Sequence, residues 1–367
     1  MPTNQLTILA NDQTTKITVF EDNSDTLWIK ANELQAATGF ELKKSGACYD
    51  PLNICIPLLE EGFTQENEAG QWLNVSKLAD RLGQACIADE SRTVWSLGLI
   101  PEVRKAMLES AIAPDFAIED IHGETVRLSD LKGKKVLIVT WATWCGCRFD
   151  VKVWQDIYDK LADPNFEIIS VAEDSEGPAV AKKWFTDANI TYKGIIDPTH
   201  KISTLFGWVN VPTAAWIDET GKIVRINESA YAAYHTVPTE RKPYTFGGEL
   251  FGEATIDWVK NGLGEHLKQS AEKRNANTRS QSAEDLLADA YFKMGLYFEN
   301  QKDLDSAQRY LDKAMELAPH NWNIHRQSWT FKGTDYAIQQ WRRKNKELYL
   351  NEKEYNYYEP LDLVEID

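Results

Sequence analysis

The chain has 367 residues, which is more than one hydrophobic core usually holds and predicts two or three domains. Lys and Arg number 40 against 56 Asp and Glu, which gives a net charge of −16. This charge argues against a general binder of nucleic acid or of anionic membranes, because both would repel it.

The sequence predicts neither a targeting segment nor a membrane segment. The N-terminal residues lack a basic region followed by an apolar stretch, so we expect no secretory signal. No window approaches the run of about 20 apolar residues that a membrane helix needs. Five cysteines, an odd number in a long chain, are not typical of a secreted disulfide framework. We therefore expect a cytoplasmic protein with no membrane partner.

Residues 1–110 contain an internal repeat. Each copy predicts a strand followed by a short helix that ends at a glycine, with Asn32 and Ser76 as the N-caps. Two copies can bury a shared core that one could not, so we predict a small duplicated α+β module. It resembles the modules at the front of copper amine oxidase-like proteins. The repeated positions, separated by a constant 44 residues, are Trp28 and Trp72, Leu34 and Leu78, and Gly39 and Gly83.

Residues 111–270 alternate strands with helices and predict an α/β domain. The apolar, β-branched run 136–140 is typical of a buried central strand, and residues 148–161 after it have helical spacing. Further strands are predicted at 166–171, 195–197, 214–218 and 223–225, and further helices at 179–188 and 253–270.

Residues 271–367 predict a polar linker, 271–282, and an all-α tail. Residues 288–321 match the length and pattern of a tetratricopeptide repeat, which makes the tail a candidate site for a protein partner. Residues 329–348 are predicted as a degenerate partner or a capping helix. The repeat requires small residues, found here at Gly295, Ala307 and Ala314, and a proline that ends the second helix, found at Pro319.

Cys145 and Cys147 lie where the central strand ends and a helix begins. The positive end of the helix and its unpaired backbone N–H groups favour thiolate over thiol and lower the pKa of a cysteine there. Thiolate is the attacking species in disulfide exchange, so this position suits a redox cysteine. Gly146 permits a tight backbone between the two sulfurs.

Residues 113–227 resemble the redoxin and cytochrome-maturation branch of the thioredoxin superfamily, of the TlpA and ResA type. The resemblance implies a thioredoxin-like fold, no cofactor, and exchange of disulfides with a protein or a small thiol. It implies an exposed nucleophile at Cys145, a second cysteine at Cys147, and a cis Pro212 beside them. The matching segments are Ala113-Pro114-Asp115-Phe116, 128–134, 141–145 and Val211-Pro212-Thr213, and the supporting residues are Trp144, Gly146, Arg148 and Thr213.

The spacing of the cysteines departs from that family, which has two residues between them where this chain has Gly146 alone. A disulfide between residues two apart is strained, hence easier to reduce and more oxidising. The short motif then suits an oxidant or isomerase better than a strong reductant. In the alternative, the two thiols do not pair and Cys147 is a buried helix residue.

Two other functional classes compete with thiol–disulfide exchange. A thiol peroxidase would have Thr or Ser three residues before the reactive cysteine and a proline further upstream, but those positions hold Ala142 and Ile138. A non-enzymatic scaffold would bind a partner through the helical repeat and only sense oxidation.

Further residues leave alternatives open. Cys48 and Cys55 are a second redox pair that exchanges with Cys145, part of a metal site with Cys86, or two unrelated thiols. No histidine lies near them, so the spacing matches no zinc pattern and we expect no metal. Asp174 either relays protons to the thiols or is a solvated carboxylate at a strand end. The six histidines are scattered and predict no site.

Overall fold

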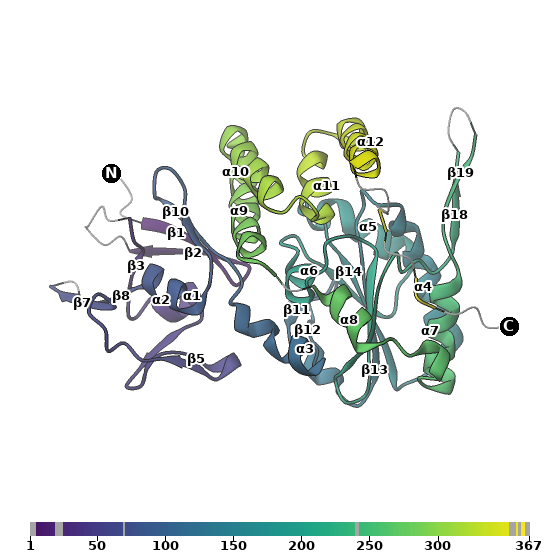
Figure 1. The fold of residues 1–367 in the computed structure, drawn as a ribbon, viewed down its shortest axis with the longest axis horizontal. Coiled ribbons are helices and arrows are strands. Elements are labelled where there is room, and N and C mark those ends of the chain that lie inside the picture. The colour runs from purple at the N-terminus through teal and green to yellow at the C-terminus, as the bar shows by residue number, and fades with distance from the viewer. Residues whose placement is uncertain are drawn as a thin grey trace. The chain divides into compact units, whose positions relative to one another are not determined.

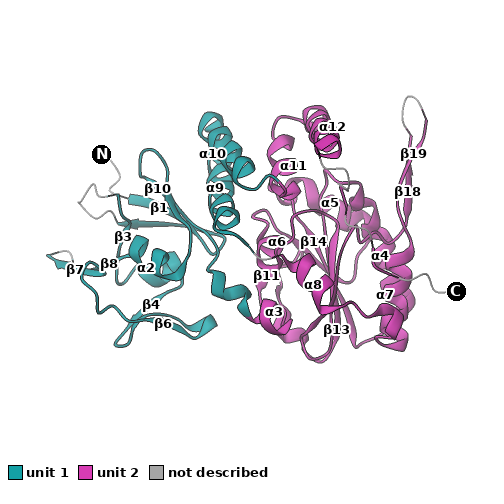
Figure 2. Ribbon diagram, viewed as in Figure 1, with its two compact units in different colours: residues 1–105, 281–319 teal, residues 106–280, 320–367 magenta. Residues whose placement is uncertain are grey.

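The computed structural model describes residues 5–18, 25–68, 70–238, 242–279, 281–351, 357–358 and 361–363, and Figure 1 labels its elements. Contacts divide the chain into unit 1, Met1–Lys105 with Gln281–Pro319, and unit 2, Ala106–Ser280 with His320–Asp367 (Figure 2). The predicted domain boundaries, after residues 110 and 270, stay a prediction. Ser280 of the predicted linker and residues 352–356 of the predicted tail lie outside the described residues.

The described residues of unit 1 form three small sheets, with strand orders β2-β1-β10-β9, β3-β8-β7 and β4-β5-β6. The two copies of the sequence repeat meet where β3 pairs antiparallel with β8. Its strands are β1 (Gln5–Ala10), β2 (Gln13–Thr18), β3 (Trp28–Lys30), β4 (Glu41–Lys43), β5 (Gly46–Tyr49), β6 (Ile54–Ile56), β7 (Thr64–Asn67), β8 (Gly70–Asn74), β9 (Cys86–Ala88) and β10 (Val94–Leu97).

The short helices of the repeat, α1 (Leu34–Thr38) and α2 (Val75–Leu82), end at glycines with positive φ, as predicted. The predicted N-caps are wrong. Asn74 caps α2 by accepting a hydrogen bond from the Lys77 N–H, because the helix begins directly after β8. Ser76 instead accepts a hydrogen bond from the backbone N–H of Leu27.

The helices α9 (Ala283–Asn300) and α10 (Leu304–Leu317) lie side by side in unit 1 (Figure 1). A Cβ on Gly295 would lie 2.7 Å from the Leu311 side chain, so only glycine allows this approach. Pro319 follows two residues after α10 ends. Their identity as a tetratricopeptide repeat stays a prediction.

Unit 2 is built on a five-stranded sheet of order β15-β14-β13-β16-β17. The strands β13, β14 and β15 are parallel, whereas β16 and β17 are antiparallel to their neighbours, and this is a thioredoxin-like α/β arrangement. The predicted α/β fold class is therefore confirmed. The five strands are β13 (Lys135–Trp141), β14 (Phe166–Ala172), β15 (Lys193–Ile196), β16 (Thr213–Ile217) and β17 (Ile223–Glu228).

The main core of unit 2 contains alternate residues of β13, namely Leu137, Val139 and Trp141, as the period of two along a strand requires. Helices α4 and α7 lie side by side over this core, where Trp154 meets Phe251 edge to face (Figure 1). The helices of this part are α3 (Lys105–Ser110), α4 (Asp150–Leu161), α5 (Pro178–Ala188), α6 (Lys201–Phe206) and α7 (Leu250–Asn261).

Unit 2 also contains antiparallel hairpins outside this sheet. The first joins β11 (Ala117–Glu119) to β12 (Thr125–Arg127), and the second joins β18 (Tyr234–Val237) to β19 (Tyr244–Gly247). The second hairpin lies within residues 228–252, whose sequence lacks a clear period and predicts a long surface loop in its place.

The predicted linker contains a helix, α8 (Ala271–Thr278), which contacts β17. A polar side chain attaches this helix to the sheet: the buried Asn277 amide donates a hydrogen bond of 2.6 Å to the Ile226 carbonyl of β17. After residue 319 the chain returns to unit 2 with α11 (Trp322–Thr330) and α12 (Thr334–Asn351), which contact each other.

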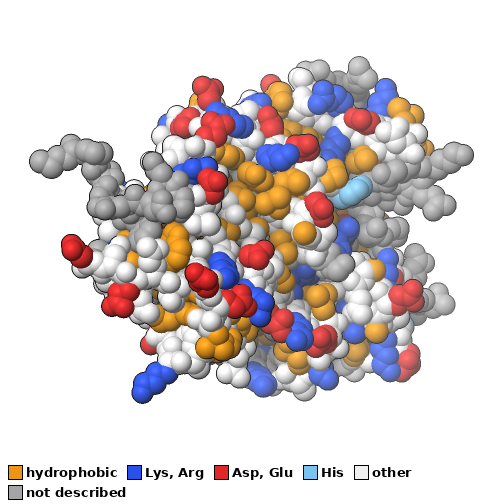
Figure 3. All heavy atoms as spheres, turned by 60° about the vertical axis from the view of Figure 1, so that its left-hand side comes forward, with side chains coloured by type: hydrophobic (Ala, Val, Ile, Leu, Met, Phe, Trp, Pro, Cys, Tyr) orange, Lys and Arg blue, Asp and Glu red, His pale blue; other side chains and the backbone are white. Residues whose placement is uncertain are grey.

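Within the described residues, no helix combines the length and apolar character needed to cross a membrane. On the face drawn in Figure 3, acidic and basic side chains are interspersed among apolar ones.

Candidate active site

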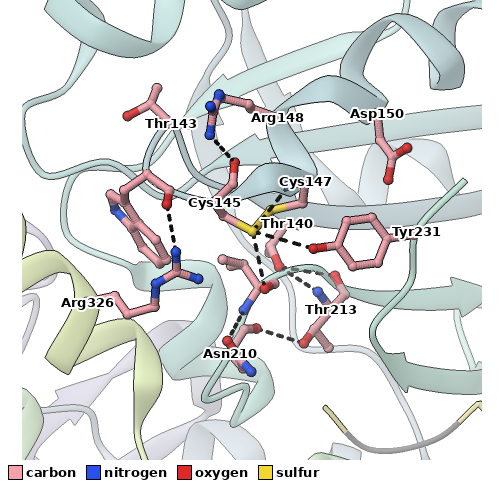
Figure 4. Close-up of a disulfide and its surroundings, with 12 residues drawn as sticks. Thr140, Thr143, Cys145, Cys147, Arg148, Asp150, Asn210, Thr213, Tyr231 and Arg326 are labelled. Atoms are coloured by element: carbon pink, nitrogen blue, oxygen red, sulfur yellow. Dashed lines mark hydrogen bonds between the residues drawn. A yellow bond between two sulfur atoms is a disulfide. The ribbon is translucent and has the colours of Figure 1, made fainter. Parts of the chain in front are cut away.

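The structure joins Cys145 to Cys147 by a disulfide, with a Cα–Cα distance of 5.2 Å (Figure 4). Cys145 follows the end of β13 and is the N-cap of a 3₁₀ turn, Gly146–Phe149, that continues into α4. Its Sγ accepts a hydrogen bond of 3.2 Å from the Cys147 backbone N–H. A donor aimed at this sulfur also stabilises the thiolate of the reduced form.

A neighbouring residue on the β18–β19 hairpin leaves no room for a side chain at position 146, so this residue has to be glycine. A Cβ at this position would lie 2.4 Å from Cε2 of Phe246, far inside normal carbon contact. The Phe246 ring in turn contacts the rings of Phe149, Tyr231 and His235. The hairpin is therefore seated directly on the turn between the cysteines.

The loop before β16 lies against the disulfide. The peptide bond between Val211 and Pro212 is cis, as the family resemblance implied. The Thr140 hydroxyl of β13 donates to the Thr213 carbonyl and accepts from the Thr213 N–H, both at 3.1 Å. The Thr213 hydroxyl donates to the carbonyl of Asn210 at 2.8 Å. These bonds fix the loop to the strand that leads to Cys145, whose Sγ lies 3.6 Å from the Val211 carbonyl oxygen.

Arg148 is bonded back onto the turn. Its guanidinium donates a 2.8 Å hydrogen bond to the Cys145 carbonyl and stacks over the rings of Phe149 and Trp184. Burial, and the charge of Arg326 nearby, lower the pKa of Arg148.

Trp144 is held by α11, a helix more than 170 residues later in the chain. Its indole N–H donates to Gln327 Oε1 at 3.0 Å, and Arg326 lies over its ring and donates to its carbonyl. The structure therefore brings the predicted supporting residues around the cysteines, and it adds α11, which sequence reasoning did not connect with this site.

Asp174 is fully buried, and the expectation of a solvated carboxylate is wrong. Its two oxygens accept hydrogen bonds from the N–H and the hydroxyl of Thr143, at 2.9 and 2.7 Å. Burial raises its pKa to about 6, although these bonds oppose the shift. The carboxylate thus holds the turn just before Trp144 in place.

The buried Asp150 carboxylate pairs with the partly buried His235, and sequence reasoning missed this pair. The Asp150 carboxylate lies 2.6 Å from His235 Nε2 and accepts a 3.0 Å hydrogen bond from the Ala232 N–H. Burial raises the pKa of Asp150, against the opposing effect of these partners. Asp150 is three residues after Cys147, but His235 comes from β18 and no local signal connects the two.

Cys145 was expected to be exposed, yet only 1% of its surface is accessible. The hydroxyl oxygens of Tyr231 and Tyr358 lie 3.9 and 4.0 Å from its Sγ and 3.1 Å from each other. Figure 4 shows the Tyr231 side chain directed at the sulfur. Tyr358 comes from the C-terminal region, and its distance along the chain hides its contribution from sequence patterns.

Residues 110–226 match the model of the AhpC/TSA family. The chain is similar to the thiol-disulfide oxidoreductase ResA of Bacillus thuringiensis (strain Al Hakam), with 34% identity over 113 residues, which is 30% of this chain and 65% of that protein. ResA of Oceanobacillus iheyensis is 32% identical over 123 residues, 32% of this chain and 64% of its own length. This part of the chain is thioredoxin-like. The match spans just under two thirds of these relatives.

Among solved structures, the exposed lipoprotein thioredoxin of Streptococcus pneumoniae is 30% identical over 31% of this chain and 88% of that one. The TM-score between the two structures is 0.28.

Outside the thioredoxin-like domain, Cys48 and Cys55 are joined by a second disulfide between directly paired positions of β5 and β6. Ser45 Oγ lies 3.4 Å from Cys48 Sγ and 3.1 Å from Cys55 Sγ. Cys86 is not disulfide-bonded, and burial raises the pKa of its thiol to about 11. Among the described residues, no group of three or more His, Cys, Asp or Glu is arranged to hold a metal ion.

Proposed function

We propose that this protein catalyses thiol–disulfide exchange, with Cys145 as the attacking cysteine and Cys147 as the resolving one. The observation that carries the proposal is the bonded cysteine pair between β13 and α4, which faces the cis Val211–Pro212 bond. The similarity to ResA proteins supports the same reaction class.

In the reducing direction, the Cys145 thiolate attacks one sulfur of a client disulfide and the other client sulfur leaves as a thiolate. The Cys147 thiolate then attacks Cys145 Sγ in the mixed disulfide. The second client sulfur leaves, takes up a proton, and the Cys145–Cys147 disulfide forms. Two electrons have passed to the client, and a second thiol must reduce the protein again. The reverse sequence oxidises a client dithiol.

The neighbours of the pair suit this chemistry. The Cys147 N–H donates to Cys145 Sγ, and the Tyr231 hydroxyl lies close enough to reorient toward a thiolate there. Tyr358 is less available, because its hydroxyl donates to the Val211 carbonyl at 3.2 Å. Tyr231 is the nearer phenol, and its hydrogen bond with the Tyr358 hydroxyl has to break before it can donate to the reacting sulfur.

The test is insulin reduction with dithiothreitol as the electron source. We expect Cys145→Ser to abolish catalysis and Cys147→Ser to accumulate a mixed disulfide that non-reducing electrophoresis detects. Cys86→Ser is the matched control, because Cys86 is not disulfide-bonded. Full activity in Cys145→Ser would refute the proposal.

The substrate class within this proposal is a protein or small thiol or disulfide. Rapid hydrogen peroxide consumption that depends on Cys145 would instead favour the thiol peroxidase alternative. A partner site on the α9–α10 pair, a scaffold role and a cytoplasmic location stay predictions.

A further inference from the structure

The chain covers its own proposed nucleophile with a C-terminal segment. We call the described residues Tyr357, Tyr358 and 361–363 the C-terminal strap. Tyr358 lies on the site itself: its hydroxyl donates to the Val211 carbonyl and lies 4.0 Å from Cys145 Sγ. This half-buried phenol therefore stands beside the sulfur that a client would have to reach.

Tyr357 binds the same loop with its main chain and its side chain. The Asn210 side-chain amide donates to the Tyr357 carbonyl at 3.0 Å, and the Tyr357 hydroxyl donates to Asn210 Oδ1 at 3.2 Å. Arg326 donates to that hydroxyl at 2.8 Å. The Tyr357 ring meets those of Trp322 and Trp341 edge to face.

A second anchor lies a few residues further along the strap. The Asp362 carboxylate accepts hydrogen bonds from the Arg225 guanidinium and, at 3.0 Å each, from the side-chain amides of Asn227 and Gln269. Leu361 and Leu363 pack against the main core of unit 2. The strap is therefore fixed by polar groups of this chain at Tyr357 and again at Asp362.

We propose that the strap is a built-in occupant of the client-binding face, and that exchange at Cys145 requires its displacement. This rests on the proposed exchange function and adds its regulation. The bonds that hold Tyr357 and Tyr358 use the Asn210 side chain and the Val211 carbonyl, whose oxygen lies 3.6 Å from Cys145 Sγ. An extended polypeptide can replace these bonds, because its backbone N–H can donate to the Val211 carbonyl and its carbonyl can accept from the Asn210 side-chain amide. A small thiol can replace neither bond.

The strap is held by side-chain bonds and packing and pairs with no strand among the described residues. Such a contact opens and closes without unfolding the sheet. The observed rate of any reaction at Cys145 is then the rate in the open form multiplied by the fraction of molecules that are open.

The test measures access to Cys145 chemically, so it does not depend on catalysis. The full-length protein is reduced with a phosphine and treated with iodoacetamide, and mass spectrometry follows alkylation of the Cys145 peptide. We expect Tyr358→Ala to be alkylated about tenfold faster than wild type or more, because the open fraction rises. Tyr358→Phe keeps the ring but loses the bond to Val211, and we expect an intermediate rate. Tyr349→Ala, exposed on α12, is the matched control and should react like wild type.

Two further measurements keep the proposal falsifiable if Tyr358→Ala misfolds, which circular dichroism would reveal. Asp362→Asn weakens the remote anchor without touching Cys145 and should also accelerate alkylation. A synthetic peptide with the sequence of residues 352–367, added to Tyr358→Phe, should slow alkylation, whereas a scrambled peptide should not. Equal alkylation rates in wild type, Tyr358→Phe and Asp362→Asn would overturn the strap proposal.

The outcome for the strap and the outcome for the function are separable. Inactivity of the wild type and of the freely alkylated Tyr358→Ala variant toward insulin would refute exchange while leaving the strap intact. Cys145-dependent insulin reduction with no change in alkylation among the strap variants would refute the strap alone.

Discussion

Replacing Gly146 by alanine should destabilise unit 2 through one identifiable contact. The added Cβ would lie 2.4 Å from Cε2 and 2.6 Å from Cζ of Phe246, whereas carbon atoms in contact lie about 3.5–4.0 Å apart. The ring must therefore move by roughly 1 Å or more, which disturbs its packing against Phe149 and His235. Overpacking of this kind costs about 1–3 kcal/mol.

A double-mutant cycle isolates that contact. Free energies of unfolding come from urea titrations of the oxidised protein followed by tryptophan fluorescence. In a Phe246→Ala background the clash partner is gone, so Gly146→Ala should cost less than about 0.5 kcal/mol. Gly248→Ala, with no atom within 4 Å of its added Cβ, is the control and should be neutral. A penalty for Gly146→Ala that persists unchanged without Phe246 would refute the reasoning.

Three further perturbations test two buried carboxylates and the second disulfide. Burial raises the pKa of Asp174 from 3.8 to about 6, so below pH 3.8 both folded and unfolded states are protonated and no penalty exists. Above about pH 6 both states are ionised, and the wild type should have lost about 3 kcal/mol of unfolding free energy relative to Asp174→Asn. Urea titrations of both proteins at about pH 4 and 7 measure this loss. A difference between the two proteins that does not change with pH would contradict it. His235→Ala removes a partner of the buried Asp150 carboxylate. We expect a loss of about 1–3 kcal/mol and a further rise in the pKa of Asp150, read from carboxyl NMR, and an unchanged titration would argue against the pair. Replacing both Cys48 and Cys55 by alanine should lower the unfolding free energy of unit 1 by roughly 2–3 kcal/mol under non-reducing conditions, and chemically reduced wild type should match the variant.

The parts of the domain with strong local patterns were predictable. The apolar run 136–140 is the core of β13, and the helical spacing of 148–161 continues into α4, because burial imposes a period on each element. The junction between them placed Cys145 correctly at the start of a helical turn. Each of these inferences uses residues close together in the chain.

The parts that close the site were not predictable, because they depend on contacts between distant segments. The bond from Trp144 to Gln327 spans 183 residues, and the contact of Cys145 with Tyr358 spans 213. Neither Gln327 nor Tyr358 belongs to a pattern that indicates a partner. The reason for Gly146 was likewise hidden, since Phe246 comes from a hairpin in a region without periodicity.

The Cys48–Cys55 disulfide provides a test of the predicted cytoplasmic location. The pair joins directly opposed residues of β5 and β6, where it cross-links the module in addition to any chemistry it performs. Disulfides that only cross-link persist in oxidising compartments and are rare where thioredoxin and glutathione keep thiols reduced. Cells quenched in acid and then treated with a mass-tagged maleimide would report the state of Cys48 and Cys55. A reduced pair agrees with the cytoplasm, whereas a fully oxidised pair would contradict it, because a crosslink reached by the reductants of the cytoplasm does not stay closed.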